Sequence, residues 1–104
     1  MIVTLRAKGD VAELERRAAA NPAAMQSIVD KAKTYGVIAH RFYGNDDGDL
    51  MVLDEWPDAE SFQKFFHDTE DEIGPLMQAA GVTAEPEVKF WRQLDTNDEV
   101  GWGA

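Results

Sequence analysis

The stretch Asp49 to Phe66, DLMVLDEWPDAESFQKFF, decides the fold of this chain. Residues 50–56 are apolar and rich in β-prone side chains, which predicts a buried strand. The second half changes period, and three phenylalanines at i, i+3 and i+4 share one helical face: Phe62, Phe65 and Phe66. Asp58 stands where a helix N-cap is expected. A strand therefore leads into a helix whose aromatic face must pack on the sheet.

The chain before this stretch predicts a strand, a kinked helix and a second strand. Residues 1–7 alternate and are rich in β-branched side chains. Asp10 is a suitable N-cap for a helix, and the Asn-Pro pair at 21–22 restarts that helix after a kink. Gly36 ends it, because glycine tolerates the left-handed backbone that terminates helices. Residues 37–43 form the second predicted strand, with alternate side chains on opposite faces.

The segment GNDDG at residues 44–48 is a dense turn signal between two strands and predicts a hairpin. A calcium loop with Gly48 as its turn glycine would place the first ligand position on Tyr43, which cannot serve. The acidic residues of this loop are therefore interpreted as part of a turn, and no metal site is expected there.

The C-terminal part predicts a short helix and a last strand. The Gly-Pro pair at 74–75 is expected to break the preceding helix, and one or two further helical turns end at Gly81. Residues 87–94, EVKFWRQL, are predicted to form a strand. Residues 95–104 are expected to be a frayed tail, although Trp102 within it is a candidate contact to a second subunit.

The predicted order is β-α-β-β-α-β, which is typical of the α+β ferredoxin-like fold: one four-stranded antiparallel sheet with helices on one face. The domain is expected to span residues 1–94, followed by the tail 95–104. If Val88 faces the helices, Tyr43 and Trp91 fall on the uncovered side. Exposing a partly apolar sheet face to water is energetically unfavourable. We therefore expect a homodimer in which two sheets pack face to face as a closed barrel.

The composition limits the classes of protein to which this chain can belong. A chain of 104 residues corresponds to one domain with a modest core. It contains no cysteine, so disulfides, thiolate metal sites and cysteine nucleophiles are excluded. No apolar run approaches the roughly 20 residues of a membrane span, and the N-terminus reads as a strand rather than a signal peptide. A cytoplasmic protein that does not associate with membranes is the default expectation.

The net charge of −10 is concentrated in one region. Residues 45–72 contain eleven acidic side chains and one basic one, Lys64. Such a surface repels phosphate backbones, so nucleic acid is not an expected partner. The simplest interpretation is a solvated acidic face that keeps the protein soluble.

The strand ending in EWPDAESF, residues 55–62, resembles the dimeric α/β-barrel superfamily, and within it the antibiotic-biosynthesis-monooxygenase-like (ABM-like) proteins. In those proteins a strand ending in Trp and a short turn open the second helix, and Trp56 and Phe62 match these framework positions. By element order the resemblance covers residues 1–94. It implies ligand pockets between the helices and the sheet. It also implies an activity among cofactor-independent oxygenases of polyphenolic substrates, haem-degrading enzymes or members without established activity.

Within this resemblance, haem degradation is disfavoured, because this chain lacks the residues that the haem-degrading members carry. They have an Asn in the first strand, which is absent here, and a Trp in the second helix, where Phe65 stands. The position of their haem-ligating His falls near residues 74–75, a Gly-Pro pair. No cofactor and no metal are therefore expected.

His40 is the candidate catalytic residue, as a general base on the pocket wall. The alternative is a hydrogen-bonded histidine of the core or interface. The candidate substrate-binding residues are aromatic: Trp56, Phe62, Phe66 and Phe90. Rings in such positions are alternatively core or interface groups. His67 is interpreted as a solvated helix-surface residue.

Asp54 and Glu55 are adjacent in a strand, so one of them is expected to face an interior. A buried carboxylate there would need a basic partner. The sequence offers these candidates: Arg6, Arg41, Lys89 and Arg92. Such a carboxylate is either part of a structural ion pair or an acid–base group.

Two functions remain open from the sequence. One is a small cofactor-independent monooxygenase-like enzyme that acts on an aromatic small molecule, with His40 accepting a proton. The other is a non-catalytic dimeric module that binds a small apolar ligand or serves as a scaffold. The fold alone does not decide between them.

Overall fold

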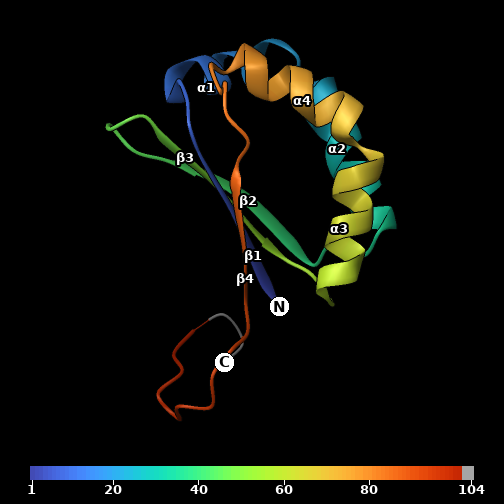
Figure 1. The fold of residues 1–104 in the computed structure, drawn as a ribbon, viewed down its shortest axis with the longest axis vertical. Helices are drawn as coiled ribbons and strands as arrows, with labels where there is room; N and C mark the ends of the chain where they lie inside the picture. Colours follow the sequence, from blue (N-terminus) through green and yellow to red (C-terminus); the bar gives the residue numbers. More distant parts are fainter. Residues whose placement is uncertain (102–104) are drawn as a thin grey trace.

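A computed structural model describes residues 1–101 of the chain as one four-stranded antiparallel sheet with helices on one side (Figure 1). The strand order is β2-β3-β1-β4. The strands are β1 (Ile2–Lys8), β2 (Ala39–Gly44), β3 (Asp49–Glu55) and β4 (Glu87–Trp91). The helices are α1 (Val11–Ala20), α2 (Pro22–Thr34), α3 (Ala59–Asp68) and α4 (Glu70–Ala79). This is the ferredoxin-like α+β fold that the sequence predicts.

The register of the sheet sorts side chains onto its two faces. Val3 in β1 lies opposite Asp54 in β3 and opposite Phe90 in β4. In the hairpin, His40 of β2 lies opposite Asp54 of β3. Side chains at directly opposite positions of antiparallel strands point to the same face. These four residues therefore lie on the face that the helices cover.

The predicted helix starts are confirmed by their caps. The side chain of Asp10 accepts a hydrogen bond from the Glu13 backbone N–H at 3.0 Å, and α1 begins at the next residue. Asn21 caps α2 and Pro22 is its first residue. The Asp58 carboxylate accepts from the Ser61 N–H at 2.7 Å, and this bond lowers the pKa of Asp58. Each cap satisfies a backbone N–H that has no partner within the helix.

The predicted helix break at residues 74–75 is wrong. The chain breaks earlier, at Thr69, whose hydroxyl donates to the Phe65 carbonyl at 2.7 Å. Helix α4 then runs through Pro75, which has no N–H to donate to the carbonyl of Asp71. Gly74 and Pro75 are exposed, so water can reach the carbonyl that Pro75 leaves without a partner. The predicted end at Gly81, which has a positive φ of 80°, is consistent with the observed end of α4 at Ala79.

The last strand ends at Trp91, three residues earlier than predicted. The reason is the partner strand: Trp91 pairs with Ile2, the first residue of β1, so residues beyond Trp91 have no strand to join. Residues 92–101 are exposed and contain no helix or strand, and this segment extends below the sheet in Figure 1. Trp102, the candidate contact to a second subunit, lies outside the described residues.

The core has two parts. The aromatic cluster contains Val3, Leu5, Ala32, Val52, Trp56, Phe62 and Phe65. The aliphatic cluster contains Leu14, Leu50, Ala80 and Val82. The first joins α2 and α3 to the sheet, whereas the second packs α1 and the end of α4 over the first residues of β3.

Among residues 1–101, no helix lies over the opposite face of the sheet (Figure 1). Tyr43 and Trp91 point to this face and are 44% and 50% exposed, as the sequence predicts. The indole N–H of Trp91 donates to the Thr4 hydroxyl at 2.9 Å, which holds the ring against the neighbouring strand. No helix among residues 1–101 is long and apolar enough to cross a membrane.

Candidate active site

A cavity of about 70 Å³ lies between the sheet and helices α2, α3 and α4. That is room for about five water molecules. Apolar side chains from β1, β2, β3 and the three helices form nearly the whole wall. Two polar side chains interrupt it, His40 from β2 and Asp54 from β3. The expected position of a ligand pocket, between helices and sheet, is where the structure has its cavity.

His40, Asp54 and Trp56 form a hydrogen-bonded chain. Nδ1 of His40 lies 2.7 Å from Oδ1 of Asp54, and the indole N–H of Trp56 donates to Oδ2 of Asp54 at 3.2 Å. Asp54 is only 5% exposed and Trp56 is fully buried. Because a buried carboxylate accepts rather than donates, Nδ1 of His40 carries the proton of the first bond. The neutral imidazole therefore has its free lone pair on Nε2, the arrangement that a general base needs.

The prediction that an Arg or Lys side chain pairs with the buried carboxylate is wrong. Arg6, Arg41 and Lys89 alternate with the cavity-facing residues of their strands and point to the uncovered face, and Arg92 lies beyond the end of β4. The partner is His40. The hairpin could have indicated this pairing, since counting outward from the turn at 45–49 pairs residue 40 with residue 54.

The structure brings three of the five predicted site residues to the cavity: His40, Phe62 and Phe66. The rings of Phe62 and Phe66 stack at 5.6 Å with an angle of 30° between their planes, and they form a flat part of the wall. Trp56 does not line the cavity but lies behind it, 5.8 Å from Phe62 and bonded to Asp54. Phe90 is 39% exposed on the edge strand and packs against Phe62 without lining the cavity.

Sequence reasoning did not assign the helical side of the cavity. Met25, Ile28 and Val29 of α2 line it, together with Leu76 and Met77 of α4. The spacing of the α2 residues does predict one apolar face, but an apolar face does not show whether it packs solidly or leaves a space.

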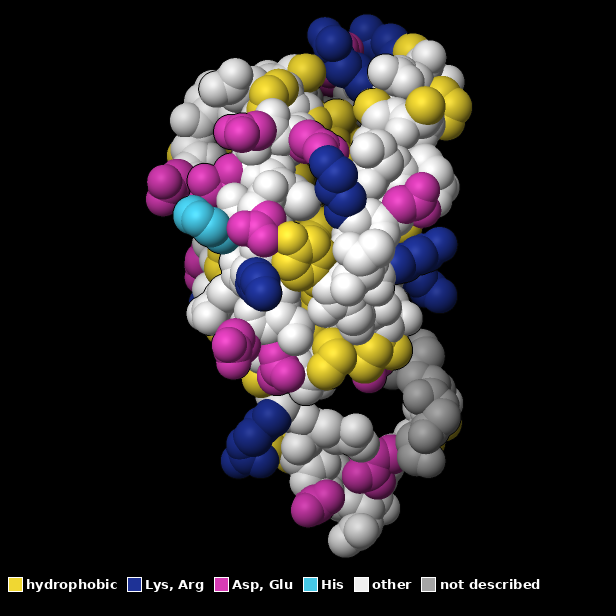
Figure 2. All heavy atoms as spheres, turned by 90° about the vertical axis from the view of Figure 1, so that its right-hand side faces the viewer, with side chains coloured by type: hydrophobic (Ala, Val, Ile, Leu, Met, Phe, Trp, Pro, Cys, Tyr) yellow, Lys and Arg dark blue, Asp and Glu magenta, His cyan; other side chains and the backbone are white. Residues whose placement is uncertain are grey.

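Two polar contacts join α2 to α3 and α4 beside the cavity. The hydroxyl of Tyr35 donates to the Asp68 carboxylate at 2.5 Å, and Lys31 forms a salt bridge with Glu72. Because Asp68 accepts this bond and carries a negative charge, the pKa of Tyr35 is raised above its ordinary value. Figure 2 shows the outer side of the helices, where acidic and basic side chains surround apolar patches.

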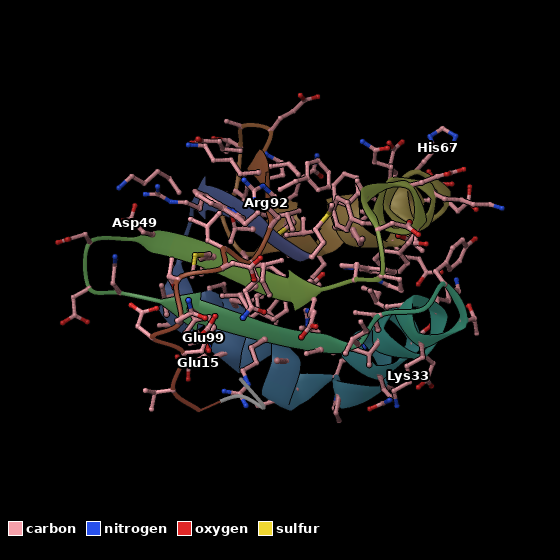
Figure 3. The ribbon with its side chains drawn as sticks, turned by 90° about the horizontal axis from the view of Figure 1, so that it is seen from below. Glu15, Lys33, Asp49, His67, Arg92 and Glu99 are labelled. Atoms are coloured by element: carbon pink, nitrogen blue, oxygen red, sulfur yellow. The ribbon has the colours of Figure 1, made fainter. Side chains whose placement is uncertain are left out.

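His67 does not belong to the site. Its side chain is 81% exposed, and in Figure 3 it projects from the outer side of α3, away from the sheet. Within residues 1–101, no group of three or more His, Asp or Glu side chains could hold a metal ion.

The sheet order, the helices on one face and the cavity between them define a class of fold, the ferredoxin-like α+β fold. No family of sequences matches the chain, and no curated protein does either. Solved structures do match it. One is named an antibiotic biosynthesis monooxygenase, with 12% identity over 91% of this chain and all of that one, and a TM-score of 0.59.

Two further structures show the same likeness. SnoaB from Streptomyces nogalater, described as a cofactor-independent oxygenase, is 18% identical over 94% of this chain and 95% of its own, with a TM-score of 0.53. A dimeric ferredoxin-like protein from an uncultured marine organism is 14% identical over 88% and 91%, with a TM-score of 0.59. At these identities the likeness establishes the fold and leaves the activity to the residues of the cavity.

Proposed function

We propose that the protein is a cofactor-independent monooxygenase-like enzyme that oxidises a small aromatic molecule, with His40 as its general base. The observation that carries this proposal is the His40–Asp54 pair on the wall of an otherwise apolar cavity. A histidine exposed to solvent does not require a buried carboxylate as its partner. A core that only stabilises the fold does not require a histidine or a carboxylate beside an empty space. The printed descriptions of two structural neighbours, a monooxygenase and a cofactor-independent oxygenase, support the same class of reaction.

The reaction needs O₂ as its second substrate and no external reductant. His40 Nε2 takes a proton from an activated CH₂ group of the substrate, which leaves a carbanion stabilised by the aromatic system. The carbanion transfers one electron to O₂, and the substrate radical and superoxide combine into a peroxide anion. The imidazolium returns its proton to form C–OOH, and loss of water leaves a carbonyl. The sum is R₂CH₂ + O₂ → R₂C=O + H₂O.

Asp54 and Trp56 are positioning residues in this proposal. Asp54 holds the Nδ1–H of His40 and stabilises the imidazolium that forms, as the carboxylate of a catalytic triad does. Trp56 occupies the other carboxylate oxygen and keeps the group from rotating. The apolar wall excludes water from the carbanion and from the peroxide.

Oxygen uptake with a panel of small hydroxylated aromatic substrates that carry an activated CH₂ group tests the proposal. His40→Gln and His40→Ala should lower kcat/KM by about 100-fold or more, the usual contribution of a general base. His67→Ala is the matched control, because it removes an exposed histidine away from the cavity, and it should leave the rate unchanged. Absence of uptake by the wild type across the panel, or full activity of both His40 variants, would leave the non-catalytic binding module as the better description.

We also propose that the uncovered face of the sheet pairs with a second copy of this chain. Tyr43 and Trp91 place large rings on that face, and a structural neighbour is described as dimeric. A stable pairing should bury at least about 1,000 Å². Light scattering at micromolar concentration should give twice the mass of the chain, and Trp91→Glu should reduce it to one chain. His67→Glu, on the outer side of α3, should remain a dimer.

A further inference from the structure

The cavity between the sheet and the helices is too small, as the structure has it, for an aromatic ring. A protein cavity that holds benzene measures about 150 Å³. This cavity measures about 70 Å³. The proposed substrate therefore fits only if one wall of the cavity moves outward, and the packing of the sheet, α2, α3 and α4 shows which wall can do so.

The sheet, α3 and α2 are held in place by buried side chains. Leu5 and Val52 of the sheet are buried, and β1 and β3 pair along their whole length. Phe62 and Phe65 of α3 are buried as well, and α2 joins the same cluster through the buried Ala32. Moving any of these walls would expose apolar surface and open the aromatic cluster, which is unfavourable.

Helix α4 is the wall that is held least. None of its residues, Glu70 to Ala79, is buried, and no side chain caps its N-terminus. The three residues that it contributes to the cavity are half-buried: Ile73, Leu76 and Met77. Pro75 leaves one backbone carbonyl in the middle of the helix without its helical partner. Few buried side chains and incomplete hydrogen bonding are the features of segments that open locally.

Both ends of α4 are anchored. Thr69, just before the helix, is 2% exposed, and its hydroxyl donates to the Phe65 carbonyl. Ala80 and Val82, just after the helix, are buried in the aliphatic cluster. The carbonyl of Ala80 also accepts a hydrogen bond from the Asp10 N–H at 2.7 Å. A helix that is fixed at both ends and loosely packed between them can move away from the cavity while the rest of the fold stays intact.

The seam between α2 and α4 is polar at one end and apolar at the other. Lys31 of α2 forms a salt bridge with Glu72 of α4, and within residues 1–101 no other side-chain hydrogen bond or salt bridge joins these two helices. One helical turn further on, the half-buried Ile28 and Leu76 line the cavity from its two sides. Because the salt bridge is exposed to water, it is weak and can open readily.

We propose that α4 is a movable wall that admits the substrate between α2 and α4, and that the Lys31–Glu72 salt bridge is the latch that holds this wall closed. The inference rests on the proposed function only in taking the cavity as the substrate site. It goes beyond that function, because it explains how a ring larger than the closed cavity can enter. The latch controls access and takes no part in the chemistry at His40.

Thiol labelling tests the inference without a substrate, because the chain contains no cysteine of its own. Val52→Cys places one thiol on the sheet wall of the cavity, and Val82→Cys places one in the aliphatic cluster. The two valines are similarly buried, so the closed structure protects both positions from iodoacetamide. If α4 moves, the thiol of Val52→Cys should react at least about 10-fold faster than that of Val82→Cys. Urea unfolding of each variant corrects both rates for global unfolding.

Removing the latch should speed the reaction at the cavity alone. Lys31→Met keeps most of the side-chain stem and removes its charge. In the Val52→Cys background it should raise the labelling rate by about 2- to 5-fold, the range that an exposed salt bridge supports, and in the Val82→Cys background it should change nothing. Lys33→Met is the matched control, because Lys33 lies on the same helix and its salt bridge is to Asp30 of that helix. It should leave both rates unchanged.

Equal corrected rates for the two thiols, or no effect of Lys31→Met on the labelling of Val52→Cys, overturn the inference. Circular dichroism checks the fold of each variant, and Ala32→Cys is a second buried reporter on the cavity wall if Val52→Cys does not fold. If labelling follows the expected pattern while no substrate consumes O₂, the movable wall stands and the oxygenase proposal fails. If O₂ uptake depends on His40 while the two thiols react equally, the oxygenase proposal stands and the movable wall fails.

Discussion

The aliphatic cluster and the aromatic cluster of the core differ in how closely they pack. The aliphatic cluster is tightly packed around Gly9: a Cβ added there would lie 2.6 Å from Cδ1 of Leu50 and 2.9 Å from Cγ2 of Val82. The aromatic cluster borders a cavity of about 70 Å³ and contains a buried carboxylate. Most of the side chains that line the cavity are aliphatic, and the space lies where α2, α3 and α4 meet the sheet.

The two clusters also differ in whether they contain features that lower the stability of the fold. The aliphatic cluster joins α1 and the end of α4 to the start of β3 with no titratable group among its buried residues. The aromatic cluster keeps an empty space and a buried Asp54, both of which lower stability unless something offsets them. We interpret the first as the part that holds the fold and the second as the part where the proposed substrate would bind.

Truncation in the two halves should therefore differ most in stability. Leu14→Ala should lower the free energy of unfolding by about 3 kcal/mol, because it opens a cavity in a filled cluster. Ile28→Ala should cost about 1 to 2 kcal/mol, because this half-buried side chain already borders the empty space. Urea unfolding measures both. Equal losses of unfolding free energy in the two variants would contradict the comparison.

Adding a methyl group tests how full the aliphatic cluster is. Gly9→Ala should destabilise by about 1 to 2 kcal/mol, since Leu50 and Val82 must move and the carbonyl oxygen of Ala80 lies 3.1 Å from the new Cβ. Gly74→Ala is the matched control, because its Cβ meets nothing within 4 Å inside α4. It should stabilise by about 0.5 to 1 kcal/mol through helix propensity. Thermal unfolding of both variants shows the sign of each effect.

The smallest expected effect concerns the bond between Tyr35 and Asp68 beside the cavity. The pKa of Tyr35 is raised in the folded protein, so the folded state holds this proton more tightly than the unfolded state does. The stabilisation is complete below pH 10, the ordinary pKa of tyrosine, and is lost as pH rises through the higher folded value. The Tm of the wild type should exceed that of Tyr35→Phe by a few degrees at pH 8, and the gap should close above pH 10.

Thermal scans from pH 8 to pH 11 on both proteins check this prediction. Asp68→Asn keeps an acceptor for the hydroxyl but removes the charge, so the gap should begin to close at lower pH in that background. A difference between wild type and Tyr35→Phe that does not depend on pH would show that the ring, rather than its hydroxyl, stabilises the contact between α2 and α3.

Much of the fold could be predicted because its signals are local. The caps at Asp10, Asn21 and Asp58 depend on residues within one helical turn, and the alternation in β2 and β3 needs only neighbours. The predictions failed where the outcome depended on distant partners. Pro75 stays inside a helix because α4 packs on the core, and β4 stops at Trp91 because β1 begins at Ile2.

The candidate site shows the same division. His40 and the aromatic face of α3 were identifiable from the sequence, and so was a buried carboxylate at Asp54 or Glu55. Their combination was not, because the charged residues that looked like partners of Asp54 lie on the other face of the sheet. Nor does an apolar pattern show whether helices and sheet meet closely or leave a cavity.

By itself, the sequence determined the order of strands and helices and which side chains share a face, since backbone periodicity and caps act over a few residues. Only the tertiary structure decided that Asp54 pairs with His40 and Trp56, and that the side chains around them leave a cavity. Cross-strand register and packing density are properties of segments brought together from across the chain, and no single segment contains them.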